Sequence, residues 1–224
     1  MPKQVMNVAA DDALTTIYRL SNDEGEEVIA ARIAERLGTR PASVAGMLSR
    51  LRRDQLVRVD AKKRIALTKT GFERAEQVVR RHRLAECLLV NVMGLEWWRA
   101  YEEAHLKEHS ISDVTEPLIV KLLNSPVVSP FGYPIPGSNG AMHMSARRVS
   151  DLEAGETGEV ERVFEEDEEL LRFFEEQGIR PGARVNVLEV ARYLGTVKLQ
   201  VGSGQGGEIV VGSDAARLIW LSDR

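Results

Sequence analysis

The chain of 224 residues contains a single cysteine, Cys87, so no disulfide can form within it. A lone thiol fits the reducing interior of a cell, where disulfides are rare. No apolar run reaches the length of about 18 residues that a membrane span requires. The first 30 residues include Asp11, Asp12, Asp23 and Glu24 and lack a long apolar stretch, so we expect no signal peptide. These absences predict a cytoplasmic protein that does not enter a membrane.

The net charge of −4 argues, taken alone, against a nucleic-acid partner. The charge is unevenly distributed, however. Residues 28–83 have 15 basic and 5 acidic side chains, a balance of +10, and the segments on either side are acidic. Such a basic region is expected of a surface that binds phosphates. A charge run by itself is equally explained by a solvated helix face.

The basic region begins with two helices and a short turn. Helical spacing of apolar residues predicts helices over 8–21 and 28–37, and Gly38 is a typical residue to end the second. Pro41 then opens a third helix, 41–54, at a position where its missing N–H costs little. Two helices joined by a short turn that contains glycine are typical of a helix-turn-helix.

A basic hairpin is predicted directly after these helices. Short strands over 56–60 and 65–68 flank the turn 61–64, which contains three cations. The hairpin is interpreted as the wing of a winged helix-turn-helix that spans residues 1–72. Because the +10 segment covers this whole motif, the combination favours binding to double-stranded nucleic acid.

Three further helices are predicted over 69–92, 96–109 and 112–124, and they are interpreted as one helical domain. The following stretch, 125–140, contains four of the eight prolines and is therefore predicted to be a loop or linker. This second domain is placed at residues 73–140.

Residues 144–224 alternate short β-like runs with glycines, interrupted by one acidic helix at 167–177. The pattern predicts a small β-barrel-like domain of about 80 residues. The chain is thus expected to be mainly α, with α+β parts.

Histidines and carboxylates gather in the helical domain. His105, Glu108 and His109 are spaced so that one helix face would present all three, and His82 and Glu86 stand four residues apart on the preceding helix. Nitrogen and carboxylate ligands of this kind suit divalent transition metals. A histidine on a helix is more often structural, but this clustering favours a metal site.

The segment from His105 to His109 has a second interpretation, because H-x-x-E-H is also the inverted zinc-peptidase motif. A zinc hydrolase would use Glu108 as its general base. Such an enzyme would need a further carboxylate ligand and a cleft, and it would leave the basic winged helix unexplained. We therefore expect a protein that is not an enzyme and has no small-molecule substrate.

The chain resembles, over nearly its whole length, the diphtheria toxin repressor and iron-dependent repressor family, which includes manganese transport regulators. The residues that establish the resemblance are ARIAERL at 31–37, HRLAE at 82–86, Glu108-His109 with Ser112-Asp113, and SPFGYPIPG at 129–137. The resemblance implies a winged helix-turn-helix, a helical metal-binding and dimerisation domain, and an SH3-like domain similar to ferrous-transport accessory proteins.

The resemblance also implies two metal sites. The primary site would use Asp12, His105, Glu108 and His109, and an ancillary site would use His82 and Glu86 with Glu165, or neighbouring Glu161, of the SH3-like domain. The chain departs from the family at three positions: His105 replaces a cysteine or glutamate, Tyr101 a histidine, and Arg162 a ligand. A primary set without sulfur favours Mn(II) or Fe(II), while Zn(II), Co(II) and Ni(II) are expected to bind in vitro.

The implied function is metal-dependent transcriptional regulation, with a homodimer that represses metal-uptake genes by binding a palindromic operator. The expected DNA contacts come from the turn, the third helix and the wing: Arg40, Ala42, Ser43, Arg50, Arg53, Lys62, Lys63 and Arg64. The alternatives besides a zinc hydrolase are a winged-helix regulator that needs no metal and a metal-storage or interaction module.

Overall fold

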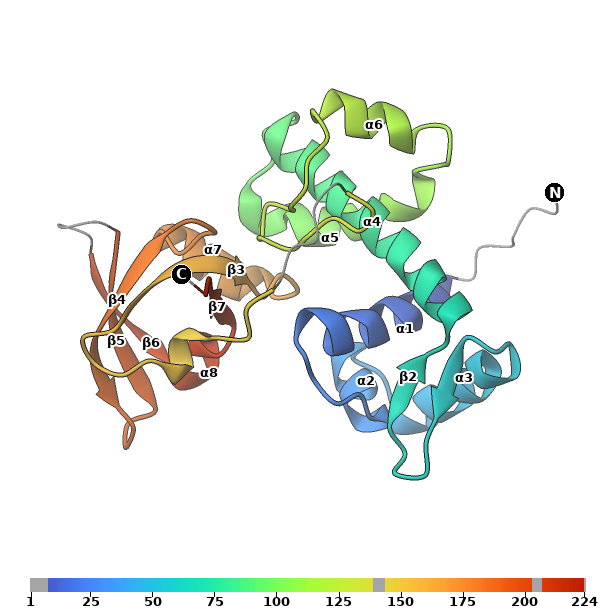
Figure 1. The fold of residues 1–224 in the computed structure, drawn as a ribbon, viewed down its shortest axis with the longest axis horizontal. Helices are drawn as coiled ribbons and strands as arrows, with labels where there is room; N and C mark the ends of the chain where they lie inside the picture. The colour runs from blue at the N-terminus through green and yellow to red at the C-terminus, as the bar shows by residue number, and fades with distance from the viewer. Residues whose placement is uncertain (1–7, 139–143, 203–206, 224) are drawn as a thin grey trace. The chain divides into compact units, whose positions relative to one another are not determined.

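The computed structural model describes residues 8–138, 144–202 and 207–223 (Figure 1). Contacts divide the chain into two compact units. The first comprises the described residues up to Arg81 together with Glu108–Ser110, and the second comprises His82–Lys107 and the residues from Ile111 onward. Among the described residues, no helix is both long and apolar enough to cross a membrane.

The first unit is built from α1 (Val8–Tyr18), α2 (Ala30–Arg36) and α3 (Pro41–Arg53), which Figure 1 shows grouped around a hairpin. Pro41 is the first residue of α3, and Gly38 adopts a φ of 56° after α2, as the sequence predicts. Apolar side chains from every element form the core, chiefly Leu14, Ile17, Ile33, Val44, Leu51, Leu56, Ile65 and Val79.

The first helix changes its hydrogen-bonding pattern near its end. The sequence predicts one helix to residue 21, but residues Arg19–Asp23 form a π-helical turn, η1, in which Glu24 N donates to Arg19 O at 3.1 Å. Ser21 Oγ donates to Ile17 O at 2.9 Å. A serine hydroxyl that binds the carbonyl four residues earlier competes with the helical ladder, which accounts for the wider turn.

The predicted hairpin consists of β1 (Val57–Val59) and β2 (Ile65–Leu67), paired antiparallel with Val57 opposite Leu67. The next helix, α4 (Lys69–Asn91), follows at once and passes from the first unit into the second. Its first turn lies tightly against the start of the hairpin: a Cβ on Gly71 would lie 1.9 Å from the carbonyl oxygen of Leu56.

The second unit begins with helices that are shorter than predicted. The expected helix 96–109 is a 3-10 turn η2 (Trp97–Arg99) followed by α5 (Ala100–His105), and the expected helix 112–124 is reduced to α6 (Glu116–Leu122). Ser112 and Thr115 exchange side-chain-to-backbone hydrogen bonds of 2.9 and 3.2 Å, which close a turn before α6 starts.

The described part of the proline-rich segment, 125–138, contains no helix, as predicted, but it is not a solvated linker. Phe131 and Tyr133 are buried in the core of the C-terminal domain, and Trp97 Nε1 donates to Pro130 O at 2.9 Å. Gly132 has a φ of 93°, and a Cβ there would lie 2.0 Å from Glu161 O. Glycine is thus required for this segment to lie against the following sheet.

The C-terminal domain is a five-stranded antiparallel sheet in the order β6-β5-β4-β3-β7. The strands are β3 (Thr157–Val163), β4 (Arg184–Ala191), β5 (Thr196–Val201), β6 (Glu208–Gly212) and β7 (Ile219–Leu221). Helix α7 (Glu168–Glu176) interrupts them, while η4 (Val149–Asp151) and α8 (Ser213–Ala216) are single turns. The predicted fold class is confirmed, because two helical domains precede a small antiparallel β domain.

Cys87 is a core residue. It is buried beside Leu84 and Ile135, and this burial raises the pKa of its thiol to about 12. A thiol of that pKa stays protonated at neutral pH, so Cys87 is not available as a nucleophile.

Candidate metal centre and nucleic-acid interface

The side chains predicted to contact DNA lie on the surface of the first unit. All eight are exposed: Arg40, Ala42, Ser43, Arg50, Arg53, Lys62, Lys63 and Arg64. Arg40 directly precedes α3, Ala42 and Ser43 occupy its first turn, and the other two arginines lie in its last turn. Residues 60–64 form the tip of the hairpin. The arrangement exposes cations on a helix and on a neighbouring hairpin, which suits binding to a duplex.

Asp60 organises the tip of the hairpin. Its carboxylate accepts hydrogen bonds from the backbone N–H groups of Lys62 and Arg64, at 2.8 and 2.9 Å, and from Arg64 Nε at 2.6 Å. Lys63 adopts a φ of 62° between them. The backbone hydrogen bond from Arg64, supported by its side chain, lowers the pKa of Asp60 below its usual value. Arg64 therefore has a structural partner, whereas Lys62 and Lys63 extend from an ordered turn.

The Asp60→Ala variant should loosen this turn without unfolding the protein. Because the pKa of Asp60 is lowered in the fold, its contribution is fully present above the unfolded value of 3.8 and is lost only as the pH falls through the lower folded pKa. We expect the amide protons of Lys62 and Arg64 to exchange with solvent severalfold faster in Asp60→Ala at pH 6, measured by NMR. Asp60→Asn, which keeps an acceptor oxygen, should exchange more slowly than Asp60→Ala, and equal rates in all three proteins would contradict this role.

The helix predicted to present His105, Glu108 and His109 on one face is interrupted between them. Helix α5 ends at His105, where Lys107 N donates to Ala104 O at 2.9 Å in a tightened turn, and Glu108–Ser110 form a separate 3-10 turn, η3. The prediction of a single helical face is therefore wrong. Glu108 and His109 occupy a 3-10 turn, so their sequence spacing from His105 does not place the three side chains on one face of an α-helix.

The first unit brings three of the predicted primary ligands together. Asp12 of α1 and the pair Glu108 and His109 of η3 each offer an atom that lies within 4.8 Å of the others. Glu108 is buried, and Asp12 and His109 are half-buried. His109 Nε2 lies 3.4 Å from Glu108 Oε1. Two carboxylates and an imidazole thus converge from segments almost a hundred residues apart in sequence.

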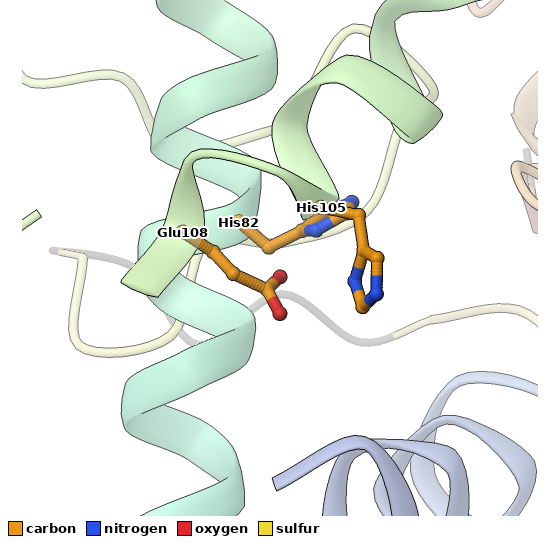
Figure 2. Close-up of side chains that lie close together, drawn as sticks. All are labelled: His82, His105 and Glu108. Atoms are coloured by element: carbon orange, nitrogen blue, oxygen red, sulfur yellow. The ribbon is translucent and has the colours of Figure 1, made fainter. Parts of the chain in front are cut away.

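His105 lies near a different histidine. Its ring centroid is 6.5 Å from that of His82 on α4, and the two rings are tilted by 55°. Figure 2 shows His82, His105 and Glu108 close together, and these three also form a group of possible ligands. The sequence assigned His82 and His105 to separate sites, and no spacing in the sequence could have predicted their proximity, because it depends on how α5 packs against α4.

A further group of possible ligands lies inside the second unit. His82, Glu86 and Glu165 offer atoms within 4.8 Å of one another, and all three residues are buried. His82 Nε2 lies 3.0 Å from Glu86 Oε1. Tyr101, which stands where the family has a histidine, places its ring 4.7 Å from that of His82.

Arg162 is not available as a ligand. Its guanidinium is buried, forms an ion pair with Glu161 and lies over the ring of Trp220 at 4.7 Å from the centroid. Glu161 is thereby engaged as well, and it accepts hydrogen bonds from Ser145 N at 3.2 Å. Glu165 is consequently the carboxylate of this strand region that joins the group.

The group around Asp12 and the group around Glu86 each fit a divalent metal on two observations. Neither carboxylate oxygen of Glu86 makes a hydrogen bond among the described residues, although His82 Nε2 lies 3.0 Å from Glu86 Oε1, and the buried Nε2 of His109 makes none among them either. A buried carboxylate or imidazole nitrogen without a hydrogen bond is costly unless something else binds it. The donor set, oxygen and nitrogen alone, suits the harder transition metals.

Comparison with known proteins matches each part of the chain to a family model. The N-terminal DNA binding domain of iron dependent repressors matches residues 7–65, their metal binding and dimerisation domain matches 68–137, and the FeoA domain matches 147–223. The iron-dependent repressor IdeR of Mycobacterium tuberculosis is 41% identical over 187 residues, covering 78% of this chain and 81% of that protein. The diphtheria toxin repressor of Corynebacterium diphtheriae is 34% identical, covering 79% and 82%.

Solved structures give the same result. A manganese-dependent transcriptional repressor in complex with manganese is 32% identical, with a TM-score of 0.85 over 95% of this chain and 98% of that one. The manganese regulator SloR is 27% identical, with a TM-score of 0.80 over 96% and 98%.

A winged helix that carries ligand groups for a divalent ion defines a class of metal-responsive regulators of transcription. This chain belongs to the iron-dependent repressor family, the family of the diphtheria toxin repressor, as its sequence predicts. It is accordingly a metal-dependent transcriptional repressor, and the prediction that it is not an enzyme is confirmed by the family, whose members are DNA-binding proteins.

Proposed function

We propose that Asp12, Glu108 and His109 form the primary metal site and that its metal is Mn(II) or Fe(II). The observation that supports this most directly is the convergence of these three side chains from α1 and η3 within one compact unit. A bound divalent cation would neutralise the two carboxylates, which otherwise repel each other at this separation. Relatives include both iron-dependent and manganese-dependent repressors, and the repressor ScaR binds Zn²⁺ and Cd²⁺ in crystals.

His105 completes this site in our proposal. It precedes Glu108 by three residues, and Figure 2 shows the two side chains beside each other. An imidazole at this position adds a nitrogen donor of intermediate softness, whereas a sulfur donor there would favour softer metal ions. The proposed second site consists of His82, Glu86 and Glu165, whose burial and lack of a sulfur donor favour the same class of metal.

The α3 and hairpin surface is proposed to bind a palindromic operator, with Ser43 near the bases and the basic side chains on phosphates. Such contacts imply affinity that falls steeply with salt. We place this activity in the cytoplasm, at promoters of metal-uptake genes. The metal then acts as a co-repressor through its preference for the conformation that binds DNA.

A homodimer would supply the two recognition helices that a palindrome requires. The second unit exposes large apolar side chains on α6 and just after α4, with Leu118 64% and Met93 65% exposed. The family model that matches this region describes a dimerisation domain. These side chains are therefore the proposed centre of the dimer contact.

A mobility-shift titration tests the function. Duplexes selected from a random pool by the Mn(II)-loaded protein should be bound with Mn(II) or Fe(II), released by a chelator and weakened severely by salt. Retention after chelation would identify a regulator that needs no metal. Metal binding without salt-dependent affinity for DNA would instead identify a storage or interaction module, and either result contradicts the proposal.

A further inference from the structure

One ion pair joins α1 to α4 beside the proposed primary site. Arg74 Nε lies 2.6 Å from Asp11 Oδ1, and both side chains are largely buried, at 21% and 7% exposure. Asp11 is the immediate neighbour of Asp12 in sequence. Successive residues of an α-helix point about 100° apart. The face of α1 that Asp11 holds against α4 therefore determines where Asp12 points.

The position of Asp12 is sensitive to the rotation of α1 about its own axis. Rotating a helix by about 30° moves a Cα on its 2.3 Å radius by about 1.2 Å. Ligand distances in metal sites are held to about 0.2 Å, so even a modest rotation would remove Asp12 from the site.

We propose that Arg74 is a positioning residue for the metal site: by holding Asp11, it sets the rotation of α1 at which Asp12 meets Glu108 and His109. The inference rests on the proposed metal site. Arg74 does not contact the metal, and its charge alone opposes metal binding. By holding Asp11, Arg74 should raise the affinity for the metal, whereas its positive charge should lower it. A measurement of metal affinity can therefore separate the two effects.

The experiment compares Mn(II) affinities of full-length variants, measured by competition with a fluorescent chelator. Arg74→Met should bind Mn(II) about tenfold more weakly at the site that depends on Asp12, although it removes a repelling cation. Arg74→Lys should recover part of the affinity, since it restores the charge pair with poorer geometry. The neutral pair Asp11→Leu with Arg74→Met keeps the net charge of the wild type and should remain weak.

The chain offers a matched control. Arg36 and Glu24 form a bidentate pair in the same unit, at 2.8 and 2.9 Å, with similar exposures of 19% and 7%. Arg36→Met should lose comparable thermal stability in the metal-free protein, yet keep the wild-type affinity for Mn(II). An equal loss of affinity in Arg36→Met would reduce the effect to general destabilisation and would overturn the proposal.

The Asp12→Ala variant distinguishes a failure of the role proposed for Arg74 from a failure of the proposed metal site. In that background, Arg74→Met should cause no further loss of Mn(II) affinity, because the geometric effect acts only through Asp12, and only the small gain from removing a repelling cation should remain. Wild-type or tighter affinity in Arg74→Met, with a loss in Asp12→Ala, overturns the role of Arg74 alone. Wild-type affinity in Asp12→Ala overturns the metal site and the role of Arg74 with it.

Discussion

Asp12→Ala is expected to abolish metal-stimulated DNA binding while leaving the fold intact. Asp12 is the only proposed primary ligand on α1, so its loss disconnects that helix from η3. Partners that only orient metal ligands typically change affinity by about 10- to 100-fold, and loss of a ligand itself should exceed that range. The measurement is fluorescence anisotropy of a selected operator duplex titrated with Mn(II).

A control variant removes an equal charge elsewhere. Glu73 is exposed on α4, and its Oε1 lies 3.9 Å from Lys69 Nζ. It belongs to none of the three groups of possible ligands. Glu73→Ala should keep the wild-type response to Mn(II), and both variants should have wild-type circular dichroism. Undiminished stimulation of DNA binding by Mn(II) in Asp12→Ala would exclude Asp12 from the proposed primary metal site.

Gly71→Ala is expected to be strongly destabilising even though alanine favours helices. A Cβ at this position would lie 1.9 Å from Leu56 O and 2.8 Å from its carbonyl carbon, so the backbone itself must move. Overpacking of this kind costs about 3 kcal/mol. For a chain of this size, that lowers Tm by about 6–12 °C.

Gly46→Ala is the matched comparison, since Gly46 also lies within a helix and a Cβ there meets nothing within 4 Å. Replacing it should leave stability unchanged or raise it by less than about 1 kcal/mol. Scanning calorimetry of the metal-free proteins distinguishes the two. A Tm for Gly71→Ala equal to that of Gly46→Ala would mean that α4 and the hairpin do not meet as described.

The sequence predicted the elements whose signals are local. Gly38 and Pro41 mark the turn before α3, and short β-like runs separated by glycines mark the strands of the C-terminal sheet. It could not predict features set by tertiary contacts. The end of α5 at His105 depends on a tightened turn. The burial of Phe131 depends on a sheet whose strands follow it in the sequence.

The candidate ligands were recoverable from residue type and family resemblance, but their grouping was not. Periodicity placed His105, Glu108 and His109 on one helical face, whereas the structure groups Glu108 and His109 with Asp12, and groups His105 with His82 and Glu108. The Arg74 contact with Asp11 was also beyond the sequence, because 63 residues separate the two and neither has a distinctive pattern.

The interruption after His105 also bears on how a family of sensors can diverge. Residue 105 ends one backbone segment, and Glu108 with His109 begins another. Because a backbone break separates residue 105 from the other two, a substitution there can change one donor of the proposed primary site without moving Glu108 and His109. In that proposed site, we expect such a substitution to change the preference among ions more than the total affinity for divalent metal.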